Sequence, residues 1–346
     1  MASAPPQFIG YAVIGAGAFG SNHLRVIREL GADPGQSVRL VAIVESDPTR
    51  AQALQSDFPE SRIFRDIDGC LASRTAGEIE LHAASVCVPT SAHAAVAGAL
   101  LQSGIDVLVE KPIAASLAEA DALIGLATRH RCILQVGHLE RFNPAVLAVH
   151  PYIHMPMFFE AHRLSIFTPR SLDVDVILDL MVHDLDIVLS LAKSPVHSLQ
   201  AVGLPVLSRK VDIANVRIEF ASGCVANFTA SRVSTERVRK LRFFQPHQYV
   251  SIDYARQDLL FIDVKPQAAP AQPDAVSLLS GLALSKPTIS PGEPLRFEIE
   301  SFLESVRTRR QPQVTAQQGR DVLALALEIN AAIADHATRA HLDRFI

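Results

Sequence analysis

The segment LDLMVHDLDIVLSLA, residues 178–192, carries polar side chains at a spacing that suits acid–base chemistry. Asp179 is followed by His183, Asp186 and Ser190 at intervals of four, seven and eleven residues. On an α-helix this spacing places all four in one stripe, and apolar residues cover most of the remaining surface. Because histidine exchanges a proton near neutral pH, Asp179 and His183 predict a general base with an acid that orients it. Asp186 is equally compatible with a structural hydrogen bond.

A glycine-rich stretch near the N-terminus could bind a dinucleotide. Residues 8–30, FIGYAVIGAGAFGSNHLRVIREL, are typical of a strand, a tight turn and an amphipathic helix. Gly15, Gly17 and Gly20 have the spacing at which the first glycine permits the turn, the second lets backbone approach a pyrophosphate, and the third lets helix and strand pack closely. The pyrophosphate would lie at the helix N-terminus, beside Ala18 and Phe19.

The next expected strand favours NAD over NADP. VRLVAIVE, residues 38–45, ends in Glu45, at the position where dinucleotide-binding folds place the acid that binds the adenosine ribose hydroxyls. A carboxylate at that position repels a 2′-phosphate. The alternative role for Glu45 is to cap the following helix.

Two further segments, residues 81–90 (LHAASVCVPT) and 106–112 (DVLVEKP), are typical of buried parallel strands that end in polar or turn residues. Ligands of open α/β sheets bind beyond the carboxyl ends of the strands. The side chains expected near the cofactor are therefore Pro89, Thr90, His93, Glu110 and Lys111. Another strand is expected over residues 132–138, and Asn143-Pro144 then marks a turn into a new region.

Length and composition limit the class of protein. The chain has 346 residues, enough for two domains, and its net charge of −4 with no dominant basic block argues against nucleic acid as a partner. The four cysteines form no C-x-x-C pair, so we expect reduced thiols in a cytoplasmic protein. We expect neither a signal peptide nor membrane insertion. No metal is expected at His183, because no further His or Cys stands at ligand spacing.

The order and spacing of VIGAGAFG, VPTSAH, EKP and DLMVHDLD resemble those of the Gfo/Idh/MocA oxidoreductase family. The resemblance implies an α/β fold with an N-terminal Rossmann domain, a doubly wound parallel sheet, over residues 7–136. A C-terminal α/β domain with a large, mostly antiparallel sheet would follow over residues 137–346, with a C-terminal helix at about 319–341 packed back on the Rossmann domain. Family sheets of this kind commonly form homodimers or homotetramers.

The resemblance also implies roles for individual residues. Lys111 matches the E-K-P lysine, and Asp179 and His183 match the D-x-x-x-H pair, so these three are the expected catalytic residues with NAD as the cofactor. The sequence leaves open whether Lys111 or His183 takes the substrate proton. Asn143, in LERFNPA, is expected to bond the cofactor ribose or the substrate.

Residues 136–146, 178–191 and 231–244 resemble the sugar-nucleotide members of the family. The implied reaction is NAD-dependent oxidation of the 3-hydroxyl of UDP-N-acetylglucosamine, whose 3-keto product a downstream aminotransferase would use in lipid A synthesis. A nucleotide diphosphate needs cations, and arginine forks suit phosphate. The expected substrate-binding residues are Arg163, Arg170 and Arg232, and a surface position on a sheet edge is the alternative for each.

Two other functions stay open at this stage. One is dehydrogenation of another sugar or polyol, such as the uronic acid of UDP-N-acetylglucosamine or inositol. The other is a non-catalytic sensor that binds a dinucleotide or sugar; the presence of Lys111, Asp179 and His183 argues against it. The Pro- and Ala-rich residues 264–294 are expected to form a long loop that covers a substrate site or joins a neighbouring subunit.

Overall fold

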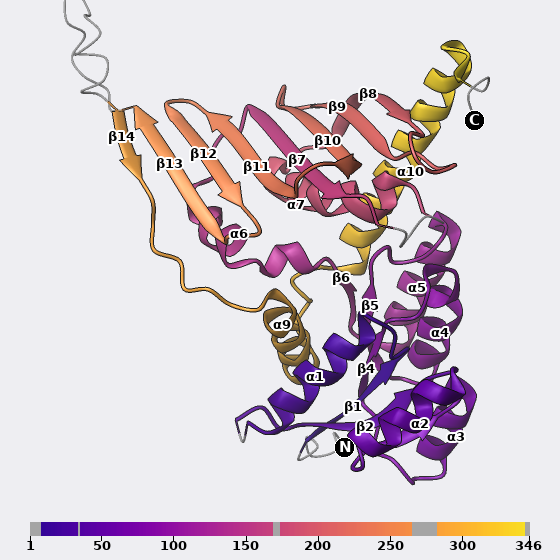
Figure 1. The fold of residues 1–346 in the computed structure, drawn as a ribbon. Helices are drawn as coiled ribbons and strands as arrows, with labels where there is room; N and C mark the ends of the chain where they lie inside the picture. Colours follow the sequence, from indigo (N-terminus) through magenta and orange to yellow (C-terminus); the bar gives the residue numbers. More distant parts are fainter. Residues whose placement is uncertain (1–7, 34, 169–173, 265–281, 343–346) are drawn as a thin grey trace, which may run out of the picture. The chain divides into compact units, whose positions relative to one another are not determined.

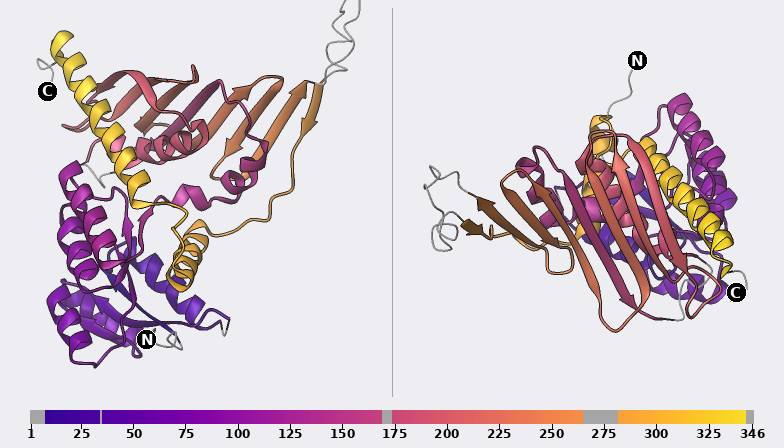
Figure 2. Two further views of the ribbon diagram at one scale, coloured as in Figure 1. Left: turned by 180° about the vertical axis from the view of Figure 1, so that it is seen from behind. Right: turned by 90° about the horizontal axis from the view of Figure 1, so that it is seen from above.

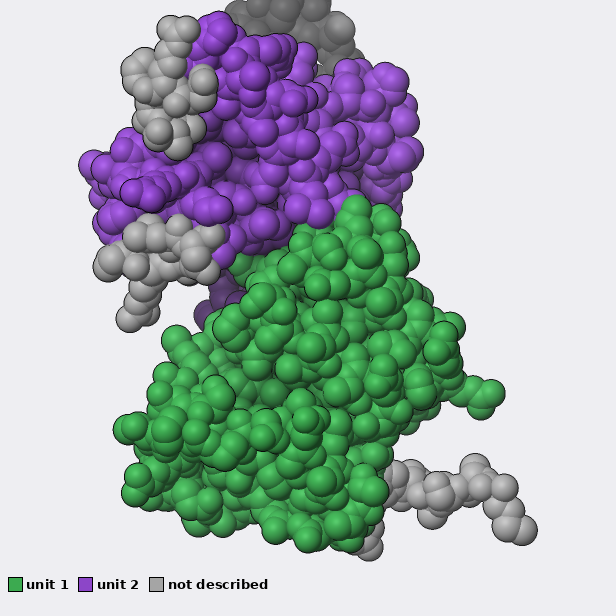
Figure 3. Space-filling model, turned by 90° about the vertical axis from the view of Figure 1, so that its right-hand side faces the viewer, with its two compact units in different colours: residues 1–138, 295–323 green, residues 139–294, 324–346 purple. Residues whose placement is uncertain are grey.

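The computed structural model describes residues 8–33, 35–168, 174–264 and 282–342. The chain divides into two compact units, coloured separately in Figure 3. Unit 1 comprises residues 1–138 and 295–323, and unit 2 comprises residues 139–294 and 324–346. The second domain expected from the sequence therefore does not keep residues 295–323, which belong to the same unit as the N-terminal sheet.

Unit 1 is built on a six-stranded, fully parallel sheet in the order β3-β2-β1-β4-β5-β6 (Figure 1). Its strands are β1 (Ile9–Ile14), β2 (Val38–Val44), β3 (Arg62–Phe64), β4 (Ala83–Val86), β5 (Asp106–Glu110) and β6 (Leu134–Gly137). The strand order reverses between β1 and β4, which is where doubly wound sheets bind their ligands. The expected Rossmann fold is confirmed.

Helices cover both faces of this sheet, so its strands are almost continuously apolar. Figure 1 shows α1 and α9 on one face and α4 with α5 on the other. The helices of unit 1 are α1 (Gly20–Gly31), α2 (Pro48–Asp57), α3 (Ile67–Thr75), α4 (Thr90–Gln102), α5 (Leu117–His130) and α9 (Pro294–Thr308). The long helix α10 (Ala316–Arg339) begins in unit 1 and ends in unit 2.

Unit 2 contains an eight-stranded sheet in the order β14-β13-β12-β11-β7-β10-β9-β8. Among its described strands only β7 and β10 pair in parallel, which confirms the expected mostly antiparallel sheet. Its strands are β7 (Phe158–Ile166), β8 (Val196–Leu204), β9 (Ile213–Phe220), β10 (Val225–Ser234), β11 (Val238–Gln245), β12 (Gln248–Asp253), β13 (Asp258–Val264) and β14 (Leu282–Ser285). Its helical segments are η1 (Leu139–Phe142), α6 (Pro144–Val149), η2 (His150–Tyr152), the π-helical turn η3 (Ile177–Met181) and α7 (Val182–Ala192).

The two faces of the second sheet differ. Buried and accessible residues alternate along β9, as expected for a strand with one face in the core. The helices α6 and α7 lie on the covered face, and in Figure 2 no described helix lies over the other face of this sheet. Polar side chains on strands β8 to β10 therefore reach solvent.

Two sequence-based boundaries need correction. The last helix begins at Ala316 and not near 319, because Thr315 and Gln318 each accept the backbone N–H of the other and so cap the helix there. Gly319 is an interior residue that packs closely: a Cβ there would lie 2.6 Å from Cγ2 of Val136. The stretch 264–294 is not one long loop, since β14 within it pairs antiparallel with β13. Residues 265–281 of that stretch lie outside the described residues.

In the part of the chain that the structure describes, no helix combines the length and apolar character that a bilayer crossing needs.

Candidate functional site

The glycine turn between β1 and α1 has the geometry that a pyrophosphate site needs. Gly15 adopts a φ of +89°, and a Cβ on Gly20 would lie 1.9 Å from the carbonyl oxygen of Gly15, so both positions require glycine. A Cβ on Gly17, by contrast, would meet nothing within 4 Å. That open space at the start of α1 fits the close backbone approach of a pyrophosphate, and Ala18 and Phe19 are exposed beside it.

Glu45 braces this turn at the end of β2. Its carboxylate accepts hydrogen bonds from the N–H groups of Ala16 at 3.0 Å and Asp47 at 2.8 Å, and from Nη1 of Arg50 at 3.0 Å. Burial alone would raise the pKa of Glu45, but the Asp47 N–H, the Arg50 guanidinium and the Ala16 N–H together hold that pKa below its ordinary value. Sequence reasoning missed Arg50, although it stands in the same ESDPTR segment.

The ends of β4 and β5 present the other expected residues of unit 1. Pro89 is exposed and precedes α4, whose first residue is the half-buried Thr90. Glu110 is the last residue of β5, and Lys111 follows it directly, with both side chains half-buried. All four therefore stand beyond carboxyl ends of strands in the sheet that carries the glycine turn.

His93 needs a correction, because its side chain is 1% exposed and both ring nitrogens meet backbone carbonyls. Nδ1 lies 2.9 Å from the carbonyl oxygen of Pro112, and Nε2 lies 2.9 Å from that of Val88. Burial lowers the pKa of His93. The ring therefore links the segments after β4 and β5, and the expected direct contact with the cofactor is replaced by a bracing role.

In unit 2, the helix predicted over residues 178–192 begins as a π-helical turn. Asp179 lies in η3, and His183 lies in the first turn of α7. Asp175 starts the segment by accepting the N–H groups of Ile177 and Leu178, both at 2.9 Å. The α-helical stripe assumed from the spacing therefore does not extend over the whole segment, although π-helical turns often occur at functional sites.

Burial separates the polar residues of this helix. Asp179 and His183 are half-buried, whereas Asp184 and Asp186 are both 2% exposed. Asp186 pairs with Nε of Arg141 at 3.1 Å, so it is a structural partner. Asp184 was not singled out from the sequence, because nothing in the local pattern distinguishes a buried aspartate from an accessible one.

Arg163 is not available to a substrate phosphate. Its Nε and Nη2 bind both carboxylate oxygens of Asp184, at 2.7 and 3.0 Å, and Nη1 binds Glu140 at 3.1 Å. Its guanidinium also lies over the ring of Tyr254, and the residue is 3% exposed. The sequence-based substrate role for Arg163 is therefore corrected: this arginine ties β7 to η1 and α7.

Arg232 is likewise a structural residue. Its Nε lies 3.0 Å from Oδ1 of Asp212, its Nη2 donates to the carbonyls of Val174 and Val211, and it is 5% exposed. The third arginine expected to bind substrate, Arg170, lies outside the described residues. The charges of Arg163 and Arg232 are thus neutralised within unit 2.

Asn143 also has a local function. Its Oδ1 accepts the N–H of Ala145 at 3.1 Å and so caps α6, while Nδ2 donates to the carbonyl of Tyr254 at 3.0 Å. Asn143 is 2% exposed, so its amide bonds groups inside the protein. The prediction that it bonds the cofactor or the substrate is therefore corrected.

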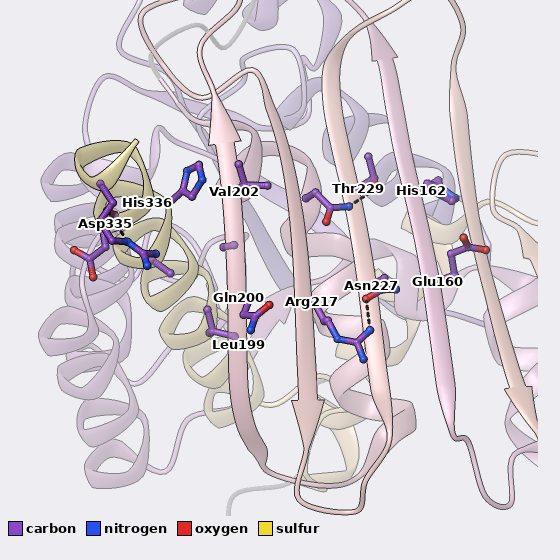
Figure 4. A pocket seen from close by; sticks show the side chains of 14 residues that line it. Glu160, His162, Leu199, Gln200, Val202, Arg217, Asn227, Thr229, Asp335 and His336 are labelled. Atoms are coloured by element: carbon purple, nitrogen blue, oxygen red, sulfur yellow. Dashed lines mark hydrogen bonds between the residues drawn. The ribbon is translucent and has the colours of Figure 1, made fainter. Parts of the chain in front are cut away.

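A polar hollow of about 790 Å³ lies elsewhere on unit 2, on the uncovered face of the sheet (Figure 4). Arg217 donates to Asn227 on the neighbouring strand, as the figure shows. Asn215 likewise donates to Thr229. None of the residues expected to act in catalysis or binding lines this hollow.

Comparison with known proteins agrees with this architecture. An oxidoreductase family profile with an NAD-binding Rossmann fold matches residues 9–138, and a Gfo/Idh/MocA C-terminal domain profile matches residues 148–245. A UDP-N-acetylglucosamine 3-dehydrogenase of Acidithiobacillus ferrooxidans is 33% identical over 322 residues, or 93% of this chain and 96% of that protein. An inositol 2-dehydrogenase of Rhizobium meliloti is 23% identical over 92% of this chain and 94% of its own.

Solved structures show the same fold. A structure of the Acidithiobacillus ferrooxidans enzyme, 33% identical, covers 94% of this chain and 97% of its own with a TM-score of 0.83. A levoglucosan dehydrogenase in complex with NADH, 17% identical, covers 95% and 98% with a TM-score of 0.83. The chain belongs to the Gfo/Idh/MocA oxidoreductase family and is an NAD-dependent oxidoreductase, as the sequence predicted.

The position of Glu45 predicts cofactor selectivity. Substituting Glu45→Gln removes the charge that repels a 2′-phosphate and releases Arg50 to bind one, so the ratio of kcat/KM for NADP to that for NAD should rise by about tenfold. Steady-state kinetics with both cofactors measures this ratio. In the double variant Glu45→Gln/Arg50→Gln the gain with NADP should be lost, and an unchanged ratio in Glu45→Gln would assign ribose recognition to other groups.

The Arg163–Asp184 pair predicts a stability effect. Arg163→Ala leaves a buried carboxylate without its cation, so the free energy of unfolding should fall by about 3–5 kcal/mol. Arg242→Ala is the matched control, because its ion pair with Glu160 at 3.2 Å is 39% and 33% exposed and should contribute at most about 1 kcal/mol. Urea unfolding monitored by circular dichroism measures both. Unchanged stability in Arg163→Ala with a raised substrate KM would return this arginine to the substrate site.

Proposed function

We propose that this protein oxidises the 3-hydroxyl of UDP-N-acetylglucosamine to the 3-keto sugar nucleotide with NAD. The observation that carries the proposal is the 33% identity, over nearly the full length of both chains, to an enzyme named for that reaction. The E-K-P lysine and the D-x-x-x-H pair of this chain support it, because alcohol oxidation needs a group that takes the hydroxyl proton.

The proposed roles follow from the chemistry of each side chain. NAD, when bound, supplies the hydride acceptor for the hydrogen on the carbinol carbon. We assign Lys111 to hydrogen-bond the substrate oxygen and stabilise the charge that develops on it. His183 receives the hydroxyl proton as the carbonyl forms, and Asp179 orients the imidazole.

A direct test follows NADH absorbance in the purified protein with NAD and a panel of four compounds: UDP-N-acetylglucosamine, its 3-deoxy analogue, its uronic acid and myo-inositol. A partner aminotransferase with glutamate would draw off the keto product. Signal with UDP-N-acetylglucosamine and none with the 3-deoxy analogue is the expected result. Signal with inositol alone would keep the family and overturn the substrate.

The catalytic assignment predicts a clean separation of turnover from cofactor binding. His183→Ala and Lys111→Ala should each lower kcat by at least about a hundredfold, because each removes a group that handles the proton or the developing charge. Isothermal titration should find the NAD affinity retained. Turnover near that of the unsubstituted protein would remove the substituted residue from the mechanism.

The diphosphate of the substrate requires a cation that the protein has not already neutralised. Arg239 stands directly opposite Arg163 in the β11–β7 pairing, on the face of the sheet whose next positions on β11, Leu241 and Phe243, are buried. Within the described residues Arg239 makes no ion pair, and its side chain is exposed. Partial desolvation and the neighbouring Arg163 charge lower the pKa of Arg239. We propose Arg239 as the diphosphate-binding arginine.

Arg239→Ala should raise the KM for UDP-N-acetylglucosamine by about tenfold, since a hydrogen bond to a charged group contributes about 1.5–3 kcal/mol. The kcat and the affinity for NAD should change little. Arg217→Ala is the matched control, since this arginine lies on the opposite sheet face and hydrogen-bonds Asn227. Equal KM values in both variants would contradict the assignment.

We also propose that the protein forms a homo-oligomer through the uncovered sheet face. An apolar row crosses five neighbouring strands in register, and its members are Phe158, Phe244, Tyr249, Ile262 and Leu284. Leu284 is 70% exposed and Phe244 38% exposed, so a second copy would bury them. Light scattering should find a dimer or tetramer that Leu284→Glu dissociates; a monomeric unsubstituted protein would refute this.

A further inference from the structure

Four polar side chains form a hydrogen-bonded chain through the interior of unit 1. The hydroxyl of Tyr11 lies 2.6 Å from Oγ of Ser85, which lies 2.9 Å from Nδ1 of His23. Nε2 of His23 then lies 2.9 Å from Oε1 of Glu110. Tyr11, Ser85 and His23 are each 0% exposed, and the four residues come from β1, β4, α1 and β5.

The two ends of this hydrogen-bonded chain differ in what they can donate and accept. Burial raises the pKa of Tyr11 far above its ordinary value, so the phenol keeps its proton and must donate it. Oγ of Ser85 is the hydrogen-bond partner of this phenol and also lies within hydrogen-bond distance of Nδ1 of His23. An ionised Glu110 carboxylate can only accept, so the contact at the other end of the chain requires Nε2 of His23 to carry the proton that it donates.

This arrangement favours positioning of the Glu110 carboxylate over proton transfer. The ring of Tyr11 packs edge-on against Phe302 of α9, with ring centroids 6.2 Å apart and an interplanar angle of 81°. A proton entering from Glu110 would end at a phenol that is 0% exposed. The chain instead presents one N–H donor of fixed direction to one carboxylate, as partners of catalytic groups do in many enzymes.

The Glu110 carboxylate is confined from a second side by Gly137 of β6. A Cβ at Gly137 would lie 2.9 Å from both carboxylate oxygens, so this glycine leaves the space that Glu110 occupies. Cys87 Sγ also lies within 4.8 Å of the His23 and Glu110 ligand atoms. The next residue in the chain after Glu110 is Lys111, so a fixed Glu110 side chain fixes the start of the turn that carries the lysine.

We propose that His23 is a positioning residue for Lys111: it holds the Glu110 carboxylate in place and thereby sets the orientation and electrostatic surroundings of the neighbouring lysine. The proposal rests on the catalytic role proposed for Lys111. His23 also lies on α1, which follows the glycine turn directly. The hydrogen bonds of His23 therefore connect the helix after that turn to the residue next to Lys111.

Two substitutions at His23 separate donation from packing. His23→Leu removes the donor at similar volume, whereas His23→Gln keeps an N–H that can reach Glu110. His23→Leu should lower kcat by about tenfold or more and His23→Gln should restore most of it, with NAD affinity unchanged in both. The control is His82→Leu, since Nδ1 of His82 binds the N–H of Gly10 at 2.9 Å elsewhere in unit 1.

A second readout needs no substrate. Lys111 is the only lysine among residues 1–138 and 295–323, and the chain has six lysines in all, so a ¹³C-methylated Lys111 is assignable by its loss in Lys111→Arg. The NMR titration midpoint of Lys111 should shift in His23→Leu and not in His23→Gln or His82→Leu. Should the unsubstituted protein oxidise none of the panel compounds, the proposed function fails while this titration still decides the role of His23.

Three results would overturn the proposal. An unchanged kcat and Lys111 titration in a folded His23→Leu protein would show that the chain only packs the domain. A loss of NAD affinity as large as the loss of kcat would place His23 in cofactor binding. Stoichiometric zinc in the purified protein, absent from His23→Leu, would make His23, Cys87 and Glu110 a metal site.

Discussion

A charge that is removed from water must meet an opposite charge, and in unit 2 this requirement fixes the helix that carries His183. Arg163 and Asp184 form two parallel hydrogen bonds, and Glu140 accepts a third from the Arg163 guanidinium. Arg141 pairs with Asp186. Two anions on the same helix are thus held by cations from η1 and β7. Because unpaired burial costs several kcal/mol per ion, these pairs leave α7 few alternative positions.

The same requirement decides which arginines remain for a ligand. Arg163 and Arg232 were attractive candidates by residue type, but both are neutralised by aspartates of their own unit. Arg239 stands beside Arg163 in the sheet register and keeps an exposed side chain. Phosphate recognition by arginine depends on free hydrogen-bond donors, so the accessible arginine is the better candidate although its sequence surroundings are no more distinctive.

In unit 1 the parallel sheet brings the candidate cofactor-binding and catalytic residues to one edge. The glycine turn, Glu45, Thr90 and Lys111 follow β1, β2, β4 and β5 respectively, and parallel strands bring all their carboxyl ends to one edge. Beneath that edge, His23 and Ser85 connect the elements through buried hydrogen bonds. A polar chain inside an apolar sheet has low tolerance for rearrangement, since each lost bond leaves a buried group unsatisfied.

The sequence alone determined the family, the NAD-binding Rossmann fold, the mostly antiparallel second sheet and the candidate residues at strand ends. Glycine spacing and apolar runs predicted the Rossmann fold, and the order of the motifs carried the resemblance to the family, which in turn implied the second sheet. Only the tertiary structure decided which of these polar side chains already bind partners within the protein. Asn143 caps a helix, His93 braces two segments and Arg163 holds Asp184, because their partners lie next to them in space and, for Asp184 and Pro112, many positions away in the chain. The pairing of a buried charge depends on these distant partners, and no local pattern records them.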